Sequence, residues 1–254
     1  MGFSNIMDSN SYSPDHPVDP ATGSLIAARD QLLGPSYRLF YDRPIHLVRG
    51  VGTKLYDIND ACFLDAYNNV ASVGHCHPHV VQAVSRQLGT LNTHTRYLHS
   101  GIVDYSERLL VTLPEQVNRV MYACTGSEVN DLALRIAEMH TGAKGVVITR
   151  DAYHGNTAAV TAISPSLGGR TSIGEHVRIV DPPDSYRIPA GELADRFAAD
   201  VTTAIADLNA AGIGLSALIV DTIFSSDGIY PDPSVLAPTV ASVRRAGGVF
   251  IADE

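Results

Sequence analysis

The sequence predicts an α/β fold with a mostly parallel β-sheet covered by helices on both faces, preceded by a smaller α+β segment. Two observations support this prediction. Short runs of β-branched residues alternate with helical stretches from residue 119 onwards, as they do in parallel sheets. The runs 145–149 and 217–220 are almost wholly apolar, which is typical of strands that are buried on both faces.

The N-terminal part of the chain is expected to be less regular. Residues 1–20 are polar and rich in Ser, Asp and Pro, which predicts a flexible arm. Residues 21–65 are expected to form a segment with one helix and three short strands. A turn at Asn59 and Asp60 separates the last two strands. The expected elements are a helix at 21–33 and strands at 45–49, 54–57 and 62–65.

Residues 66–254 are expected to form one large domain, because helical and strand-like patterns alternate throughout this region. The expected strands lie at 119–124, 145–149, 177–180, 217–220 and 249–252. The expected helices lie at 79–88, 102–113, 128–140, 190–210 and 234–246. No helix follows the last strand, which favours a truncated or partial sequence over an edge strand at a natural terminus. We therefore expect the fold to be incomplete on its C-terminal side.

Composition and charge argue against several classes of protein. The chain has 18 basic and 27 acidic side chains and a net charge of −9. This balance argues against a nucleic-acid-binding protein, which needs a basic surface. No stretch of about 18 apolar residues is present, so no membrane span is expected. The N-terminus lacks a secretory pattern and three cysteines cannot make a disulfide framework, so we expect a cytoplasmic protein.

Residues 74–79 (GHCHPH) resemble a metal site only in composition. Their spacing is not that of a zinc motif, and the sequence offers no evident second pair of ligands. No metal is therefore expected. Pro78 is expected to open the next helix, with His75 and His77 in the turn before it.

The carboxyl ends of the strands are where a ligand is expected, because doubly wound sheets bind ligands there. Residues 125–130 (TGSEVN) lead from an expected strand into a helix through a small polar turn. Free N–H groups at a helix start suit a phosphate group, and the hydroxyl of Ser127 can add a hydrogen bond. The alternative is an ordinary N-cap, in which Thr125 or Ser127 caps a helix that binds nothing.

Two further strand ends carry candidate residues. Tyr153 lies just beyond the run 145–149, where an aromatic ring can stack on a flat ligand, and Gly155 allows a close approach of the backbone. The alternative is that Tyr153 and His154 simply pack at the margin of the sheet. Asp253 ends an apolar strand, where a carboxylate needs a partner. A protonated pyridine nitrogen is one such partner, and an arginine or a helix N-terminus is another.

Taken in order, these motifs resemble the class III aminotransferases, a family of pyridoxal 5′-phosphate (PLP) enzymes of fold type I that includes ornithine and GABA aminotransferases. The resemblance covers most of residues 50–254. The matching segments are 55–57 (LYD), 63–65 (FLD), 74–78 (GHCHP), 125–130 (TGSEVN), 153–156 (YHGN) and 249–254 (VFIADE). The resemblance implies a PLP-dependent enzyme whose large domain has the fold type I architecture.

The resemblance implies cofactor-binding roles for five residues. Gly126 and Ser127 would bind the PLP phosphate with backbone N–H groups and a hydroxyl. Tyr153 would stack on the pyridine ring, and His154 would lie beside that ring. Asp253 would pair with the pyridinium nitrogen and keep it protonated, which makes the ring an electron sink.

The resemblance also implies an activity and a missing group. The implied activity is transfer of an amino group from an amine or amino acid to a keto acid or aldehyde. The resemblance also implies that the full-length protein is a homodimer. The family's Schiff-base lysine matches neither Lys54 nor Lys144 and is expected beyond residue 254, so no catalytic residue is assigned here. Two other interpretations stay open: a phospho-lyase that eliminates phosphate and ammonia from a phosphoamine, and a catalytically inactive fragment.

Two segments are similar to one subgroup of the family. Residues 67–70 (YNNV) and 92–99 (NTHTRYLH) resemble the subgroup that contains ethanolamine-phosphate and phosphohydroxylysine phospho-lyases. Asn68 and His99 would fall where this family lines its substrate pocket. Both are therefore candidates for substrate contact.

The segment after the run 217–220 departs from the common family pattern. Asp221 stands where many class III aminotransferases have a glutamate, and Ser226 stands where ω-amino transaminases have a glutamate that pairs with a gating arginine. This difference argues against ornithine-like or GABA-like substrates. The two consecutive serines are similar to dialkylglycine decarboxylase. Asp221 and Ser226 complete the set of candidate substrate-binding residues.

Overall fold

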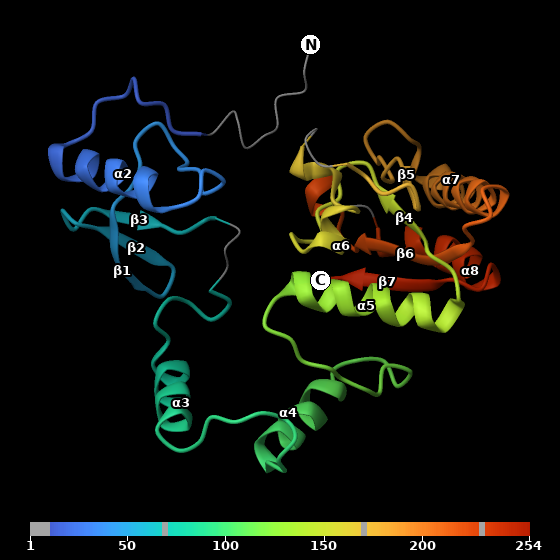
Figure 1. Cartoon of the computed structure of the whole chain (residues 1–254), viewed down its shortest axis with the longest axis horizontal. Coiled ribbons are helices and arrows are strands. Elements are labelled where there is room, and N and C mark those ends of the chain that lie inside the picture. The colour runs from blue at the N-terminus through green and yellow to red at the C-terminus, as the bar shows by residue number, and fades with distance from the viewer. Residues whose placement is uncertain (1–10, 68–70, 169–171, 229–231) are drawn as a thin grey trace. The chain divides into compact units, whose positions relative to one another are not determined.

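The chain divides into two units, Met1–Asn118 and Arg119–Glu254, in a computed structural model (Figure 1). The structure describes residues 11–67, 71–168, 172–228 and 232–254. Among these residues, no helix has the length and apolar character that crossing a membrane requires. Each unit is described by itself below.

The first unit begins with helix α2 (Pro20–Leu32), which is capped by Asp19. One oxygen of the Asp19 side chain accepts hydrogen bonds from the N–H groups of Ala21 and Thr22, both at 3.0 Å. An antiparallel sheet follows in the order β1-β2-β3. Its strands are Leu47–Val51, Lys54–Asp57 and Cys62–Leu64, and the later helices are α3 (Pro78–Leu88) and α4 (Ser100–Leu110). The expected helix and three strands of this segment are confirmed within a few residues.

The turn and the histidine-rich motif of the first unit have structural explanations. Asp57 accepts hydrogen bonds from the N–H groups of Asn59 and Ala61, which closes the predicted turn. His75 Nε2 lies 2.7 Å from a carboxylate oxygen of Asp65, and this hydrogen bond is the main cause of the lowered pKa of Asp65. Pro78 opens α3 as predicted.

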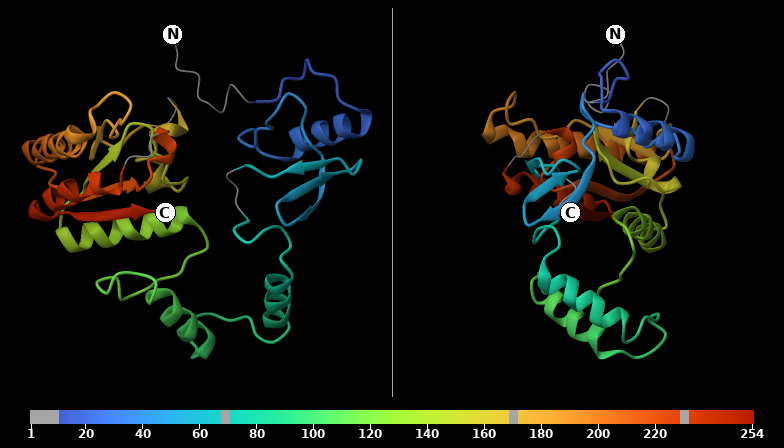
Figure 2. Two further views of the ribbon diagram at one scale, coloured as in Figure 1. Left: turned by 180° about the vertical axis from the view of Figure 1, so that it is seen from behind. Right: turned by 90° about the vertical axis from the view of Figure 1, so that its left-hand side faces the viewer.

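The second unit is built on a four-stranded parallel sheet with the strand order β5-β4-β6-β7. The strands are Gly145–Thr149 (β4), Val177–Val180 (β5), Leu215–Asp221 (β6) and Val249–Asp253 (β7). Every residue of β4 is buried, as its apolar sequence predicts. In Figure 2 the strands of the second unit lie as one layer between the helices of that unit.

Helices cover both faces of this sheet, which confirms the predicted fold class. Because side chains alternate along a strand, Val147 of β4 packs with Phe197 and Leu208, whereas Ile148 packs with Val160 on the other face. Helices α7 (Ala190–Ala210) and α8 (Leu236–Arg245) cover the first face, and α5 (Gly126–Thr141) and α6 (Ala158–Thr161) cover the second. Three short 3₁₀ helices complete the unit: Pro165–Leu167 (η1), Ser225–Asp227 (η2) and Pro233–Val235 (η3).

One expected strand, 119–124, is wrong. These residues have no regular structure and pair with no neighbouring strand in the described part of the chain. The side chains of Met121 and Tyr122 are 64% and 44% exposed, so no burial compensates for holding the backbone extended. A strand is stable only beside a neighbouring strand, and no strand of the described part of the chain pairs with this segment.

The connections of the sheet create a switch point between β4 and β6, which are neighbours. The chain leaves β4 toward the face that α6 covers, and it leaves β6 toward the face that α8 covers. In sheets of this kind, ligands bind outside the carboxyl ends of the strands where the connections diverge. The residues after β4, β6 and β7 are therefore the ones to inspect.

Candidate functional site

Thr125 and Glu128 form a reciprocal capping box at the start of α5. The Thr125 hydroxyl accepts from the Glu128 N–H at 3.2 Å, and the Glu128 carboxylate accepts from the N–H groups of Cys124 and Thr125. The box therefore leaves the N–H groups of Gly126 and Ser127 unused at the positive end of the helix dipole. The ordinary N-cap and the predicted anion-binding turn are both compatible with this arrangement, because they use different N–H groups.

Gly126 is not required by the packing of the chain. A Cβ atom at this position would meet no heavy atom within 4 Å, and its backbone conformation is helical rather than left-handed. The space that a side chain at residue 126 would occupy is therefore open. A ligand group can approach this backbone closely because the residue has no side chain.

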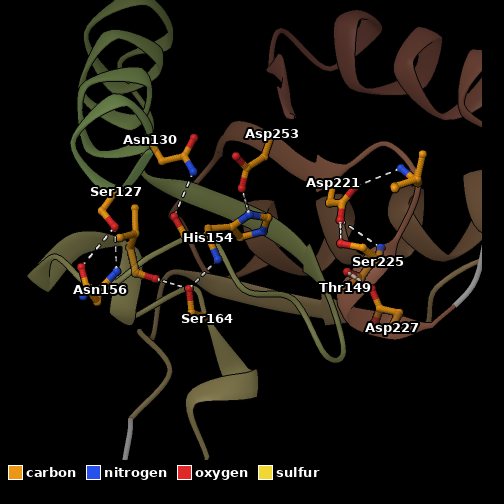
Figure 3. A network of polar contacts seen from close by, with 12 residues as sticks. Ser127, Asn130, Thr149, His154, Asn156, Ser164, Asp221, Ser225, Asp227 and Asp253 are labelled. Carbon is orange, nitrogen blue, oxygen red and sulfur yellow. Dashed lines mark hydrogen bonds and ion pairs between the residues drawn. The ribbon is translucent and has the colours of Figure 1, made fainter. Parts of the chain in front are cut away.

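The loop after β4 is held against the first turn of α5, as Figure 3 shows. The Ser127 hydroxyl donates to the Asn156 side-chain oxygen and accepts from the Asn156 N–H, both at 3.1 Å. Gly155 has a φ of +127°, and a Cβ atom there would lie 2.3 Å from Ser127 Oγ. Asn130, which is 4% exposed, donates from its side-chain nitrogen to the His154 carbonyl at 2.9 Å.

His154 joins this loop to the end of β7. Its Nδ1 lies 2.8 Å from an oxygen of Asp253, and the exposed fractions of the two side chains are 1% and 22% (Figure 3). The His154 N–H donates to the buried Ser164 hydroxyl at 2.9 Å, which fixes the backbone as well as the ring. The ring's other nitrogen, Nε2, is buried and has no hydrogen-bond partner among the described residues. Asp253 uses one carboxylate oxygen in this pair, so the other can accept a proton donor.

Four of the sequence candidates thus lie along one connected set of contacts at the carboxyl edge of the sheet. Gly126 and Ser127 begin α5, and the chain of contacts runs from Ser127 through the β4 loop to His154 and Asp253. The fifth, Tyr153, precedes His154 and is 47% exposed. Its ring is accessible for stacking rather than packed into the core.

Asp221 caps the segment that follows β6. Its carboxylate accepts from the N–H groups of Ile223 and Ser225, at 3.0 and 2.9 Å, and from the Ser225 hydroxyl. Phe224 has a φ of +53°, is 1% exposed and packs edge-to-face on Phe197 at 5.8 Å between ring centroids. The cap and this anchor both constrain the course of η2.

Ser226, a further candidate for substrate contact, is exposed within η2. His99 is the N-cap of α4, and its Nδ1 accepts from the Gly101 N–H at 3.1 Å. Asn68 lies outside the described residues.

Asp227 is a residue of this edge that sequence reasoning missed. One of its oxygens accepts from the Thr149 hydroxyl at 2.8 Å, and the other accepts from the Asp151 N–H at 2.9 Å. Burial raises the pKa of Asp227, an effect that these hydrogen bonds oppose and that the nearby carboxylates of Asp151 and Asp221 reinforce. Asp227 does not directly follow a strand, so inspecting strand ends could not find it.

Comparison with known proteins gives the class first. Solved structures with the same α/β arrangement are PLP-dependent enzymes of fold type I. They include an amine transaminase from an uncultivated Pseudomonas species in its PLP-bound form, with a TM-score of 0.74 over 88% of this chain and 54% of that one. At 23% identity, this likeness shows the fold alone.

The family follows from the sequence match. Residues 40–254 match the model of the class III aminotransferases, and the chain belongs to that family. Class III aminotransferases use PLP as their cofactor. The predicted family, fold type and cofactor class are thus confirmed.

Several relatives are more similar in sequence. The chain is 34% identical to alanine–glyoxylate aminotransferase 2-like of Drosophila melanogaster, over 90% of this chain and 49% of that protein. It is 31% identical to ethanolamine-phosphate phospho-lyase homolog 1 of Caenorhabditis elegans, over 91% and 53%. A phospholyase from Arthrobacter, solved in complex with phosphoethanolamine, is 41% identical with a TM-score of 0.85, over 90% and 55%. The chain thus spans about half the length of these relatives.

Proposed function

We propose that this chain supplies the PLP-binding edge of a class III aminotransferase that transfers an amino group from an amine or amino acid to a keto acid or aldehyde. The observation that supports this most directly is the connected set of contacts from the start of α5 to the end of β7. In this set, a helix start with N–H groups that its capping box does not use, an exposed aromatic ring and a carboxylate lie at one edge of the sheet. Those three groups match the phosphate, the ring and the pyridinium nitrogen of PLP.

In this proposal, the helix start holds the cofactor phosphate. The N–H groups of Gly126 and Ser127 are left unused by the capping box, and the helix dipole favours an anion there. The Ser127 hydroxyl can rotate from Asn156 toward the phosphate while it still accepts from the Asn156 N–H. Because Gly126 has no side chain, the phosphate can approach the backbone N–H groups closely.

The ring end of the cofactor is held by Tyr153, His154 and Asp253. Tyr153 would stack on the pyridine ring, and Asp253 would accept a hydrogen bond from the N–H of the pyridinium nitrogen. His154 donates from Nδ1 to Asp253 and thereby orients the carboxylate. When bound, PLP supplies the electron sink for chemistry at the substrate Cα, and Asp253 keeps the ring protonated for that purpose.

We infer that the Schiff-base lysine is not one of the two lysines present. Lys144 precedes the first residue of β4, at the opposite end of that strand from Tyr153, and it lies 3.7 Å from Glu138. Lys54 begins β2 of the first unit. The 254 residues are therefore expected to bind PLP without covalent attachment and to show no turnover. A PLP-derived mass on either lysine after borohydride reduction would contradict this inference.

Four residues are proposed for the substrate side. Ser226 is exposed in η2, and Asp221 acts through that segment because its own carboxylate is occupied by hydrogen bonds. Asn68 and His99 remain proposals that rest on the family pattern. A homodimer and a cytoplasmic location are proposed on the same family and composition grounds, although relatives from Arabidopsis thaliana and Homo sapiens are named as mitochondrial.

The cofactor proposal can be tested with pyridoxamine 5′-phosphate, which needs no lysine to bind. We expect calorimetry to detect it, and we expect pyridoxamine without the phosphate to bind far more weakly. In Gly126→Ala, the free energy of unfolding should rise by roughly 0.4–1 kcal/mol, since the backbone is helical and open space surrounds it. The same substitution should weaken binding of the phosphorylated compound at least tenfold. A variant that is more stable and binds equally well would overturn the assigned role of this turn.

A second activity, phospho-lyase elimination, is favoured by one observation. The Arthrobacter phospholyase is 41% identical to this chain, which exceeds the identity to the curated aminotransferases given above. The two activities differ in their products. When a protein that contains this chain together with the lysine is given phosphoethanolamine, release of phosphate without consumption of a keto acid would identify a phospho-lyase. Transfer of an amino group to an added keto acid would identify an aminotransferase.

A further inference from the structure

Asp227 joins the segments that follow β6 and β4, the two strands on either side of the switch point of the sheet. It belongs to the segment that leaves β6 toward α8, yet both of its side-chain hydrogen bonds reach the end of β4, at Thr149 and Asp151. The two segments leave the sheet on opposite faces. In Figure 3 the side chain of Asp227 points to that of Thr149, apart from the contact between His154 and Asp253.

We propose that Asp227 is a positioning residue that holds the segment after β6, which carries Ser226, in a defined place against the segment after β4, which carries Tyr153. The link itself is a matter of geometry. The consequence of the link for binding rests on the proposed function, in which Ser226 contacts the substrate and Tyr153 contacts the cofactor.

The rest of the η2 segment is fixed to other parts of the unit. Asp221 caps the segment from the end of β6, and Phe224 anchors it in the core beside Phe197. Neither contact is a hydrogen bond to β4, although Phe224 belongs to the same core cluster as Val147 of that strand. Among the described residues, the side-chain hydrogen bonds that join residues 222–228 to residues 149–151 are those of Asp227.

The site of Asp227 is unfavourable for a charge, which argues that the carboxylate has a specific task there. Burial raises the pKa of Asp227, and Asp151 and Asp221 add two like charges nearby. An apolar or uncharged residue would avoid this cost. What a carboxylate adds is two acceptor oxygens on one short side chain, and the Thr149 hydroxyl and the Asp151 N–H occupy both.

Two substitutions separate positioning from charge. In Asp227→Ala, both hydrogen bonds are lost. In Asp227→Asn, the side-chain oxygen can still accept from Asp151, and the side-chain nitrogen can donate to the Thr149 hydroxyl. Asp195→Ala, at an exposed position on α7, is the matched control for loss of a carboxylate. If geometry rather than charge is what matters, Asp227→Asn should keep the link between the two segments that Asp227→Ala loses.

Hydrogen exchange of the ligand-free chain tests the link without any cofactor. We expect the Asp151 amide to exchange about tenfold faster in Asp227→Ala, because it loses its acceptor, and residues 151–154 to exchange faster with it. Asp227→Asn and Asp195→Ala should match the parent. Faster exchange confined to residues 222–228 would overturn the link. So would equal acceleration in Asp227→Asn and Asp227→Ala, which would indicate a role for charge.

Binding of pyridoxamine 5′-phosphate then tests the consequence. We expect about tenfold weaker binding in Asp227→Ala, with recovery in Asp227→Asn, since only the Ala variant frees the segment that carries Tyr153. If the exchange result holds but binding is unchanged, the positioning role is overturned. If the parent chain does not bind the compound at all, the proposed function fails, and the exchange experiment still decides whether Asp227 links the two segments.

Discussion

Helices α7 and α3 are both amphipathic, but they differ in what covers their apolar faces. In α7 six residues are buried, among them Phe197, Val201 and Leu208, which pack against β4 and β6. In α3 no residue is buried, and Val84 and Leu88 are 51% and 66% exposed. An apolar stripe therefore shows that a helix needs a partner and does not show where that partner is.

The comparison extends to the two units. In the second, the sheet supplies an apolar surface for each described helix, so the periodicity of the sequence and the burial agree. In the first, α3 and α4 have no buried residue at all. The chain spans about half the length of these relatives.

The largest effect expected from this contrast comes from one substitution made in both helices. Leu208→Ala removes a side chain with 0% exposure and should lower the free energy of unfolding by roughly 3–5 kcal/mol, because it leaves a cavity. Leu88→Ala should change it by no more than about 0.5 kcal/mol. Urea denaturation monitored by circular dichroism measures both. A large loss for Leu88→Ala would show that α3 is covered in solution, and the contrast would be wrong.

Glycines provide the next comparison. Gly155 in the second unit and Gly52 in the first both have positive φ, at +127° and +58°. An alanine Cβ would meet Ser127 at 2.3 Å in the first case and nothing within 4 Å in the second. We expect Gly155→Ala to cost about 2–3 kcal/mol from strain and crowding, and Gly52→Ala about 1 kcal/mol from backbone strain alone. Equal costs in denaturant titrations would mean that the close approach to Ser127 is absent in solution.

Removing the first side chain of a helix cap should change the free energy of unfolding by a smaller amount, and the change should differ between α5 and α3. Thr125→Ala removes the capping box of α5 and is expected to cost about 1 kcal/mol. His77→Ala at the start of α3 should cost almost nothing by comparison, since the His77 side chain makes no capping hydrogen bond. Thermal unfolding of the two variants measures the difference. The reverse order would show that the start of α3 is held by a contact of His77 outside the helix.

The smallest expected effects concern pH, and they have opposite signs in the two units. Burial raises the pKa of Asp227, so its charged form disfavours folding above that pKa, and the penalty disappears as the pH falls through the raised pKa toward the ordinary value. Asp227→Asn should therefore raise Tm at neutral pH and have little effect at acid pH. A Tm gain that persists at acid pH would have another cause.

Asp65 in the first unit should behave in the opposite way. The His75 hydrogen bond lowers the pKa of Asp65, so its stabilisation is present above the ordinary carboxyl pKa and is lost as the pH falls through the lowered pKa. Asp65→Asn should lower Tm at neutral pH, and the difference should shrink in acid. The Tm values of both variants, measured from pH 7 down to acid pH, test the two signs together.

Local pattern predicted most of the second unit, and tertiary context explains the rest. The bounds of β4, β5 and α7 agree with the sequence analysis because each is long or apolar enough to be unambiguous. The expected strand 119–124 fails because a strand needs a neighbour, which is a property of the whole sheet. Inspecting the ends of strands led to His154 and Asp253, since topology brings such ends together. Asp227 reaches the same edge only through the fold of η2, which no local pattern reveals.

The open space around Gly126 has a consequence on an evolutionary timescale. Gly155 is needed by the fold itself, because a side chain there would collide with Ser127. Gly126 has no such neighbour and makes its helix start weaker than alanine would. If residue 126 binds the cofactor phosphate as proposed, a lineage that has lost this binding should soon replace residue 126 and keep residue 155 as glycine. The pair would act as a record of whether descendants of this gene still make a working enzyme.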